Sequence, residues 1–500
     1  MLRLFGGKPD HPLADPKEAR RILGELPAQD PFKALEELTH WLESVTAAGQ
    51  FRPEARIQAL FAVDEAAQPR LRRLARDYFA AERPSRFQEN RLWSAVHGYY
   101  RQAGLSLAKA VDLFVQGAKG AEQARASLPA LLVRTLRSLA QQIKWMHLRY
   151  GPIDPAVWAV FNGVYAFAEA RQLAQARVPA YPGVPGESSP QLEFLKGAMF
   201  SAASPDCLLP AEADLAERLI AHFAPSFAIA PAPAPELGWW IDLSRPMAPQ
   251  RSARGAQAAP AARWFGAGAA LAEAEALVER VYTRGQVPSE LAAVTGVDPE
   301  SVLGVLRHLV RAWSPQPPER KSQRHAVKSR VFVAHGYEGA LGAMGAAGGL
   351  GSSAEGTESW VVENVSAGGF GAVVPQLKGD WLRVGTLVAL QGEGGTNWVL
   401  GIVRRVNKTT PREARVGIQT LARSAEVRRF EVSGALEEGV LMRDAGAAEV
   451  RILLKPGIYA PLQNLEVREG ERTRVYIPQG LAERGEDYDI GRYREMVRES

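Results

Sequence analysis

Two short segments of the chain combine residue types that could bind an anionic nucleotide. The first is Arg320-Lys-Ser-Gln-Arg324, and the second is Asn364-Val-Ser366-Ala-Gly368-Gly369. Each guanidinium of the arginine pair is a planar fork that can hold a phosphate through two hydrogen bonds. The same fork suits the O6 and N7 edge of guanine, and its face can stack on a base. A phosphate-bearing ligand with guanine bases therefore suits the first segment.

The second segment offers groups that could contact a base edge. On a strand, Asn364 and Ser366 point to one face and Val365 points to the other. An amide and a hydroxyl on one face supply both donors and acceptors. Gly368 and Gly369 remove side chains where the backbone must turn or a ligand must approach closely. Each segment alone also has an ordinary interpretation, as a solvated basic stretch or as a turn with self-bonded side chains.

Short β runs surround both segments, between Ser329 and about Val475. Those of the first part are Val331-Phe-Val, Trp360-Val-Val, Ala372-Val-Val, Leu387-Val-Ala-Leu, Trp398-Val-Leu-Gly-Ile-Val and Arg415-Val-Gly-Ile. Each run is bounded by glycine, asparagine, proline or charged residues, which is typical of strands at close spacing. So many short strands favour a small barrel or sandwich.

The order of these features resembles the PilZ domain. An RxxxR motif before a strand, and an NxSxxG motif followed by Phe370-Gly-Ala-Val-Val, are similar to the motifs of that family. The resemblance covers residues 318–421 and implies a six-stranded barrel that binds cyclic di-GMP. It also implies that Arg320 and Arg324 contact phosphate and guanine. The strand-side contacts would come from Asn364, Ser366, Gly368 and Gly369.

Two stretches have no counterpart in a minimal domain of this kind. Residues 336–356 include eight glycines and are expected to form a flexible loop, with a mobile flap over the ligand as the alternative. From Phe430 onward, further β runs predict a β extension packed on the barrel or a second small β domain.

The first half of the chain is predicted to be helical. Asp15-Pro16 and Asp30-Pro31 each place an N-cap acceptor before a proline at the first helical position. Apolar residues at helical spacing predict further helices. These stretches are 53–81, 87–100, 105–150 with a break near 117–120, 155–173, 190–202, 211–223 and 267–282. The sequence assigns this half to no known family.

The chain is therefore predicted to be a multidomain protein, α followed by all-β. The expected parts are a helical domain (1–224), an Ala/Pro-rich linker region (225–262), a helical hairpin segment (263–314), a PilZ-like barrel (315–428) and a β-rich C-terminal extension (429–500). A helix-turn-helix over residues 288–313 is the alternative for the hairpin. Its second helix begins with Pro299, Glu300 and Ser301 rather than with the basic and amide side chains that contact DNA bases.

Composition narrows the class of protein. The net charge of +5 is too small to indicate nucleic-acid binding by itself. A single cysteine, Cys207, excludes an intramolecular disulfide framework and a thiolate metal site. The sequence shows no signal peptide and no membrane-spanning run, which predicts a cytoplasmic protein. His325 and His335 flank the first β run and suit a surface or ligand-side contact better than a metal site.

The sequence contains no recognisable catalytic motif and no cofactor motif, so a receptor is expected rather than an enzyme. The favoured function is a cyclic di-GMP-binding signalling receptor that changes the pose of its helical half to regulate a protein partner. The alternatives are a PilZ-like scaffold that binds no ligand and, less favoured, a cyclic di-GMP-responsive DNA-binding regulator.

Overall fold

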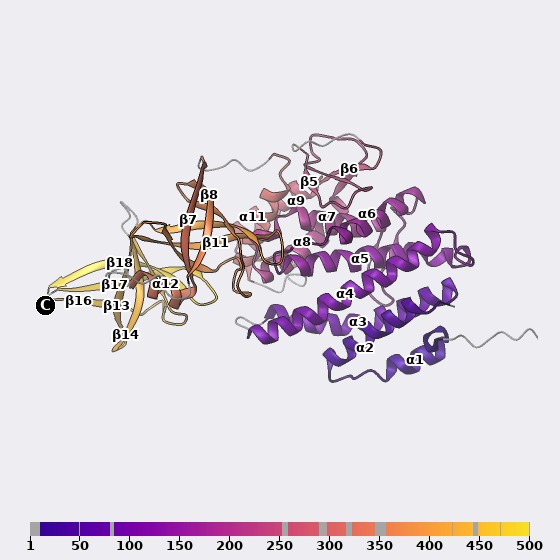
Figure 1. The fold of residues 1–500 in the computed structure, drawn as a ribbon, viewed down its shortest axis with the longest axis horizontal. Coiled ribbons are helices and arrows are strands. Elements are labelled where there is room, and N and C mark those ends of the chain that lie inside the picture. Colours follow the sequence, from indigo (N-terminus) through magenta and orange to yellow (C-terminus); the bar gives the residue numbers. More distant parts are fainter. Residues whose placement is uncertain are drawn as a thin grey trace, which may run out of the picture. The chain divides into compact units, whose positions relative to one another are not determined.

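The computed structural model describes residues 11–499 except 50, 81–84, 253–258, 290–297, 317–322, 346–356, 423, 444–448 and 471. The chain divides into two compact units (Figure 1). The helical unit comprises residues up to Arg149, Ile153–Pro205 and Pro210–Pro318. The barrel unit comprises Tyr150–Pro152, Asp206–Leu209 and Glu319–Ser500.

Long helices form most of the helical unit. They are α1 (Pro16–Gly24), α2 (Pro31–Ala47), α3 (Pro53–Ala80), α4 (Arg86–Val115), α5 (Leu128–His147), α6 (Pro155–Ala170), α7 (Pro190–Ala202) and α8 (Pro210–Phe223). The predicted caps are confirmed, because the Asp15 carboxylate accepts from the Lys17 amide at 2.8 Å and Asp30 accepts from the Lys33 amide at 3.0 Å. The predicted break near 117–120 is confirmed too, since α4 ends at Val115 and both Gly117 and Gly120 have positive φ.

A small antiparallel sheet lies in the segment that was expected to be a linker. Its strands are β3 (Ala228–Ala230), β4 (Trp239–Asp242), β5 (Gln250–Arg251) and β6 (Ala262–Gly266), in the order β3-β6-β4-β5. The interpretation of 225–262 as a linker is therefore wrong for the described residues. Trp240 and Trp264 pack in an apolar cluster on this sheet, and their burial stabilises strands that alanine and proline would otherwise disfavour. A two-residue ladder, β1 (Val178–Pro179) with β2 (Glu187–Ser188), lies elsewhere in the unit.

Two helices that pack on one another close the helical unit, α9 (Ala270–Arg284) and α11 (Pro299–Trp313). The turn proposed for a helix-turn-helix falls on residues outside the described part of the chain. Asp298 caps α11 by accepting from the Ser301 amide at 2.9 Å. Arg307, one of the basic residues of α11, lies over the Tyr282 ring of α9.

The first barrel is closed, antiparallel and six-stranded, which confirms the predicted fold class. Its strands are β7 (His325–His335), β8 (Glu358–Ser366), β9 (Gly369–Val374), β10 (Leu387–Gly392), β11 (Trp398–Lys408) and β12 (Ala414–Ala422). Around the ring the order is β7-β8-β9-β12-β11-β10, and β10 pairs with β7 to close it. Alternate residues such as Trp360, Val362 and Val416 fill the interior.

The glycine-rich insert between β7 and β8 contains a helix, α12 (Gly336–Gly345). The expectation of a flexible loop or flap is therefore wrong for these residues, and residues 346–356 lie outside the described part. Tyr337 and Leu341 are buried in an apolar cluster with residues of both barrels, and the Tyr337 hydroxyl donates to the Glu438 carbonyl at 2.5 Å. Burial of these side chains offsets the low helical propensity of the glycines.

The C-terminal residues form a second closed barrel of six antiparallel strands. The strands are β13 (Ser424–Val432), β14 (Ala435–Arg443), β15 (Glu449–Leu454), β16 (Leu465–Glu469), β17 (Arg472–Arg484) and β18 (Asp489–Glu499). The ring order is β13-β14-β15-β18-β17-β16. The predicted β structure is confirmed: the region forms a barrel of its own, and residues such as Met442 and Leu453 share an apolar cluster with the first barrel. Its first strand begins at Ser424, before the predicted boundary at 429.

Two short segments from early in the chain complete the first barrel. The Tyr150 ring is buried in the barrel interior, and its hydroxyl accepts from the Val384 amide at 3.2 Å. Asp206 binds the Arg405 guanidinium of β11 at 2.6 Å. Both segments belong to the barrel unit although they lie between helices in the sequence. No helix within the described residues has the length and apolar character needed to span a membrane.

Candidate functional site

A β-bulge turns the Asn-x-Ser side chains of β8 outward. Trp360 and Val362 point into the barrel, so regular alternation would point Asn364 inward as well. The pairing with β9 shifts between Val362 and Asn364, and this leaves Glu363 as the extra, exposed residue. After the shift Val365 packs against the barrel core. The face predicted for Asn364 and Ser366 is thus the outer surface of the barrel.

Asn364 lies over a position without a side chain. A Cβ on Gly371, its ladder partner in β9, would come within 2.6 Å of the Asn364 amide nitrogen. Gly371 therefore makes room for this amide. Asn364 Oδ1 is buried and accepts no hydrogen bond from any described residue. A buried acceptor without a donor costs free energy, which makes this atom a strong candidate for a ligand contact.

Ser366 and Gly369 form the turn that ends β8. The Ser366 hydroxyl donates to the Gly369 carbonyl at 3.1 Å, so the local self-bonded turn considered from the sequence does form. Gly369 has φ +153°, and a Cβ there would lie 1.9 Å from the Ile418 carbonyl oxygen. Only glycine fits this approach of β9 to β12. Gly368 differs, since a Cβ there would meet open space.

Of the predicted arginine pair, the structure describes only Arg324, and Arg320 lies outside the described residues. Arg324 is exposed and immediately precedes His325, whose ladder partner is Val365. Arg324 therefore lies beside the end of β8, where Ser366 is. The structure thus brings Arg324, Asn364, Ser366 and Gly369 to one end of the first barrel.

Sequence reasoning missed residues of β9 and β12 on the same outer surface. Gly371 pairs with Gly417, and Gly369 pairs with Gln419, which is exposed. The Gln419 side chain accepts from Arg404 Nε at 2.7 Å. We call the outward side of Asn364, Ser366, Gly371 and Gln419 the polar face. The alternation of Val416 and Ile418, both buried, could have indicated that Gln419 points outward.

The polar face can bind a flat, hydrogen-bonding group next to an anion. Two amides and a hydroxyl supply donors and acceptors, and the bare backbone at Gly371 lets a planar base approach. Arg324 adds a positive charge at the edge of this face. These are the requirements of a nucleotide rather than of a metal ion.

His325 and His335 are the first and last residues of β7 and lie at opposite ends of this strand. His335 stacks on Trp381 with ring centroids 3.8 Å apart, and burial lowers the pKa of its imidazole. His325 is exposed at the other end of the strand. Across the described part of the chain, no group of three or more His, Cys, Asp and Glu side chains is arranged to hold a metal.

Comparison with known families gives two matches. Residues 17–234 match the model described as cyclic-di-GMP receptor FimW, N-terminal domain. Residues 353–426 match the model described as cyclic-di-GMP receptor FimW, middle PilZ domain. The first match gives the helical half a family that the sequence alone did not suggest. The second begins after β7 and the arginine pair. No curated protein matches the chain.

Proposed function

This chain belongs to the family of the cyclic-di-GMP receptor FimW, and from that premise we propose that it binds cyclic di-GMP on the polar face of the first barrel. The observation that carries the proposal is the buried Asn364 Oδ1 without a donor, beside the bare backbone of Gly371. A guanine edge has N–H donors that can satisfy this oxygen.

Each predicted residue has a role in this proposal. Arg324, with Arg320 from the same segment, binds phosphate and guanine through its guanidinium fork. Asn364 and Ser366 contact a base edge, and the glycines at 368 and 369 allow close approach of the ligand. Gln419, held by Arg404, adds a second amide on the far side of Gly371.

The proposed response to the ligand uses the position of the arginine segment in the chain. This segment connects α11 to β7, so a ligand that fixes it on the polar face changes the pose of the helical unit. The free energy by which the ligand can shift this equilibrium equals the difference in its binding free energy between the two poses. The helical unit then regulates a protein partner. We place the protein in the cytoplasm, where such a second messenger acts, and assign it a receptor role without catalysis.

The test is calorimetric titration of cyclic di-GMP into the full-length protein. We expect Arg324→Ala and Ser366→Ala to weaken binding, the first by about 10- to 100-fold, because charge-assisted hydrogen bonds are lost. Arg429→Ala is the matched control, since this exposed arginine lies on the second barrel. Absence of binding to the unmodified protein would favour the scaffold function instead. Solution scattering that is unchanged at saturating ligand would contradict only the change of pose.

A further inference from the structure

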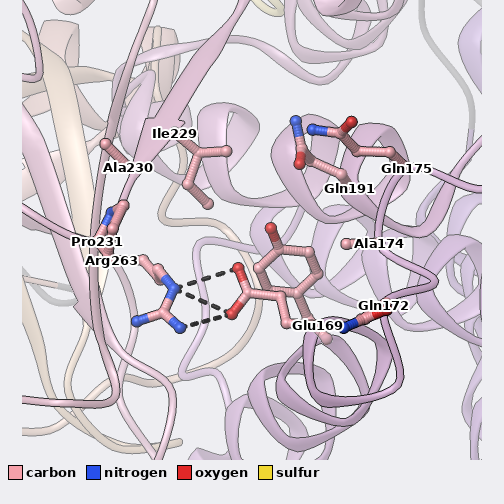
Figure 2. Close-up of a pocket in the computed structure, with 10 residues that line it drawn as sticks. Glu169, Gln172, Ala174, Gln175, Gln191, Ile229, Ala230, Pro231 and Arg263 are labelled. Atoms are coloured by element: carbon pink, nitrogen blue, oxygen red, sulfur yellow. Dashed lines mark hydrogen bonds and ion pairs between the residues drawn. The ribbon is translucent and has the colours of Figure 1, made fainter.

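A pocket of about 430 Å³ opens in the helical unit, where α6 ends beside the start of α7 and the small sheet (Figure 2). Among the described residues its lining belongs to the helical unit, and its binding role does not depend on the ligand proposed for the polar face. The pocket falls in the size range of natural ligand sites.

An ion pair forms one wall of this pocket without giving it net charge. Arg263 of β6 binds the Glu169 carboxylate of α6 through Nε at 2.9 and 3.1 Å and through Nη2 at 2.7 Å (Figure 2). Burial, and after it the nearby Glu169 carboxylate, raise the pKa of the Tyr165 hydroxyl on the same wall. Because these charges are satisfied by one another, the wall does not attract an ionic ligand.

Three glutamine side chains on the pocket supply hydrogen-bonding capacity that no described residue uses. Gln172 and Gln175 follow α6, and Gln191 lies in the first turn of α7. Figure 2 shows Gln175 and Gln191 on the other side of the pocket from Ala230. Within the described residues, none of the three side-chain amides makes a hydrogen bond. Each offers a donor and an acceptor, which is the pattern that pairs with a peptide group.

The opposite wall includes residues of a strand at the edge of the small sheet. β3 is the outer strand of the order β3-β6-β4-β5, and among the described strands it pairs only with β6. Its residues Ile229 and Ala230 line the pocket, followed by Pro231. The backbone groups on an outer edge have no strand partner, so they can pair with an added extended chain.

We propose that this pocket binds a short extended peptide of a partner protein, which adds to the β3 edge. The peptide pairs its backbone with β3, and the amides of Gln175 and Gln191 bind its other groups. The neutral wall and the side chain of Ile229 favour uncharged residues in the segment. β3 has three residues, so the bound stretch is about 10 Å long at a rise of about 3.3 Å per residue. The site gives the helical unit a defined class of partner.

The test starts with selection of random short peptides, displayed on phage, against the purified full-length protein. An enriched peptide is then synthesised and titrated into the protein and its variants. We expect Gln175→Leu and Gln191→Leu each to weaken binding by about 5- to 10-fold, because each removes hydrogen bonds to the peptide. Gln58→Leu, at an exposed glutamine of α3, is the matched control and should leave binding unchanged. Gln175 is itself exposed, so its replacement should not impair folding.

Hydrogen exchange gives a second readout, specific for strand addition. Bound peptide should slow exchange in residues 227–231 and leave the amides of α3 unchanged. A selection that yields no binding peptide overturns the proposal. Peptides that bind the wild type and both glutamine variants equally, or that give no protection at 227–231, also overturn it.

Discussion

The two barrels of this protein have the same strand order and different surfaces. In each ring the first three strands are neighbours, the third strand pairs with the sixth, and the first pairs with the fourth. The C-terminal barrel therefore repeats the topology of the PilZ-like barrel. The comparison isolates what a ligand site needs beyond this fold.

The difference is sharpest at equivalent ladder positions. The second residue of the first strand pairs with Asn364 in the first barrel and with Met442 in the second. These residues pair in turn with Gly371 and Arg451. Met442 is fully buried among residues of both barrels, and Arg451 donates to the Leu421 carbonyl at 2.6 Å. The face that is polar in one barrel is a packing surface in the other.

The largest effect is expected at the first residue of the third strand. Gly369→Ala should destabilise the first barrel by about 4 kcal/mol or more, because its Cβ would overlap the Ile418 carbonyl. Glu449→Ala changes the equivalent, exposed residue of the second barrel and should shift stability by less than about 0.5 kcal/mol. Urea denaturation compares the two. Equal effects would show that the barrels do not differ at this position.

Giving the second barrel the residue of the first should also be costly. Met442→Asn should destabilise the protein by about 3 kcal/mol, since it removes buried apolar contacts and buries an amide without a partner. Met496→Asn is the control, because Met496 is 42% exposed on β18. Thermal unfolding would detect the difference, and a Met442→Asn protein as stable as the control would contradict the buried packing surface.

Acid should weaken the second barrel through Glu495. Hydrogen bonds from Arg443 and Arg474 lower the pKa of this carboxyl from 4.5 to about 2. Its contribution is therefore present above pH 4.5 and is lost as the pH falls from 4.5 toward 2. We expect Glu495 to contribute about 1 kcal/mol to the free energy of unfolding, since the arginines are partly exposed and solvent screens their attraction to the carboxylate. The urea midpoint measured down to about pH 3 should fall less in Glu495→Gln than in the wild type. Identical falls would exclude this contribution.

The smallest effect separates the two glycines of the motif. Gly368→Ala should change the free energy of unfolding by less than about 0.5 kcal/mol, because open space surrounds the added methyl group. Urea denaturation of the Gly368→Ala and Gly369→Ala proteins, measured side by side, checks this expectation. A large loss of stability would mean that Gly368, like Gly369, has a structural role.

Much of the first barrel could be predicted from the sequence because its strands and motifs are local patterns. The β runs at Trp360, Leu387 and Trp398 have alternating apolar residues or end in turn residues. These patterns depend only on neighbouring residues, so they indicate strands whatever the rest of the chain does. The bulge at Glu363 could not be predicted, although the outward direction of Asn364 depends on it. A shift in register is a property of two strands and leaves no mark in one of them.

The errors have a common physical cause. Alanine, proline and glycine dominate residues 225–262 and 336–356, so composition indicated a linker and a loop. Strands of two to five residues and one short helix nevertheless form there. They form because tertiary packing buries Trp264 in the sheet and Tyr337 in α12. Intrinsic propensity is a weak guide wherever such packing decides the outcome.

The burial of Tyr150 in the first barrel constrains how the gene could have evolved. Tyr150 and Asp206 lie within the part that matches the N-terminal family model, yet they complete the barrel matched by the other model. Recombination that exchanged one half for an unrelated sequence would leave a hole in the barrel interior and remove the acidic partner of Arg405. The two halves are therefore expected to be inherited together, and an isolated C-terminal fragment would be an incomplete copy of the receptor.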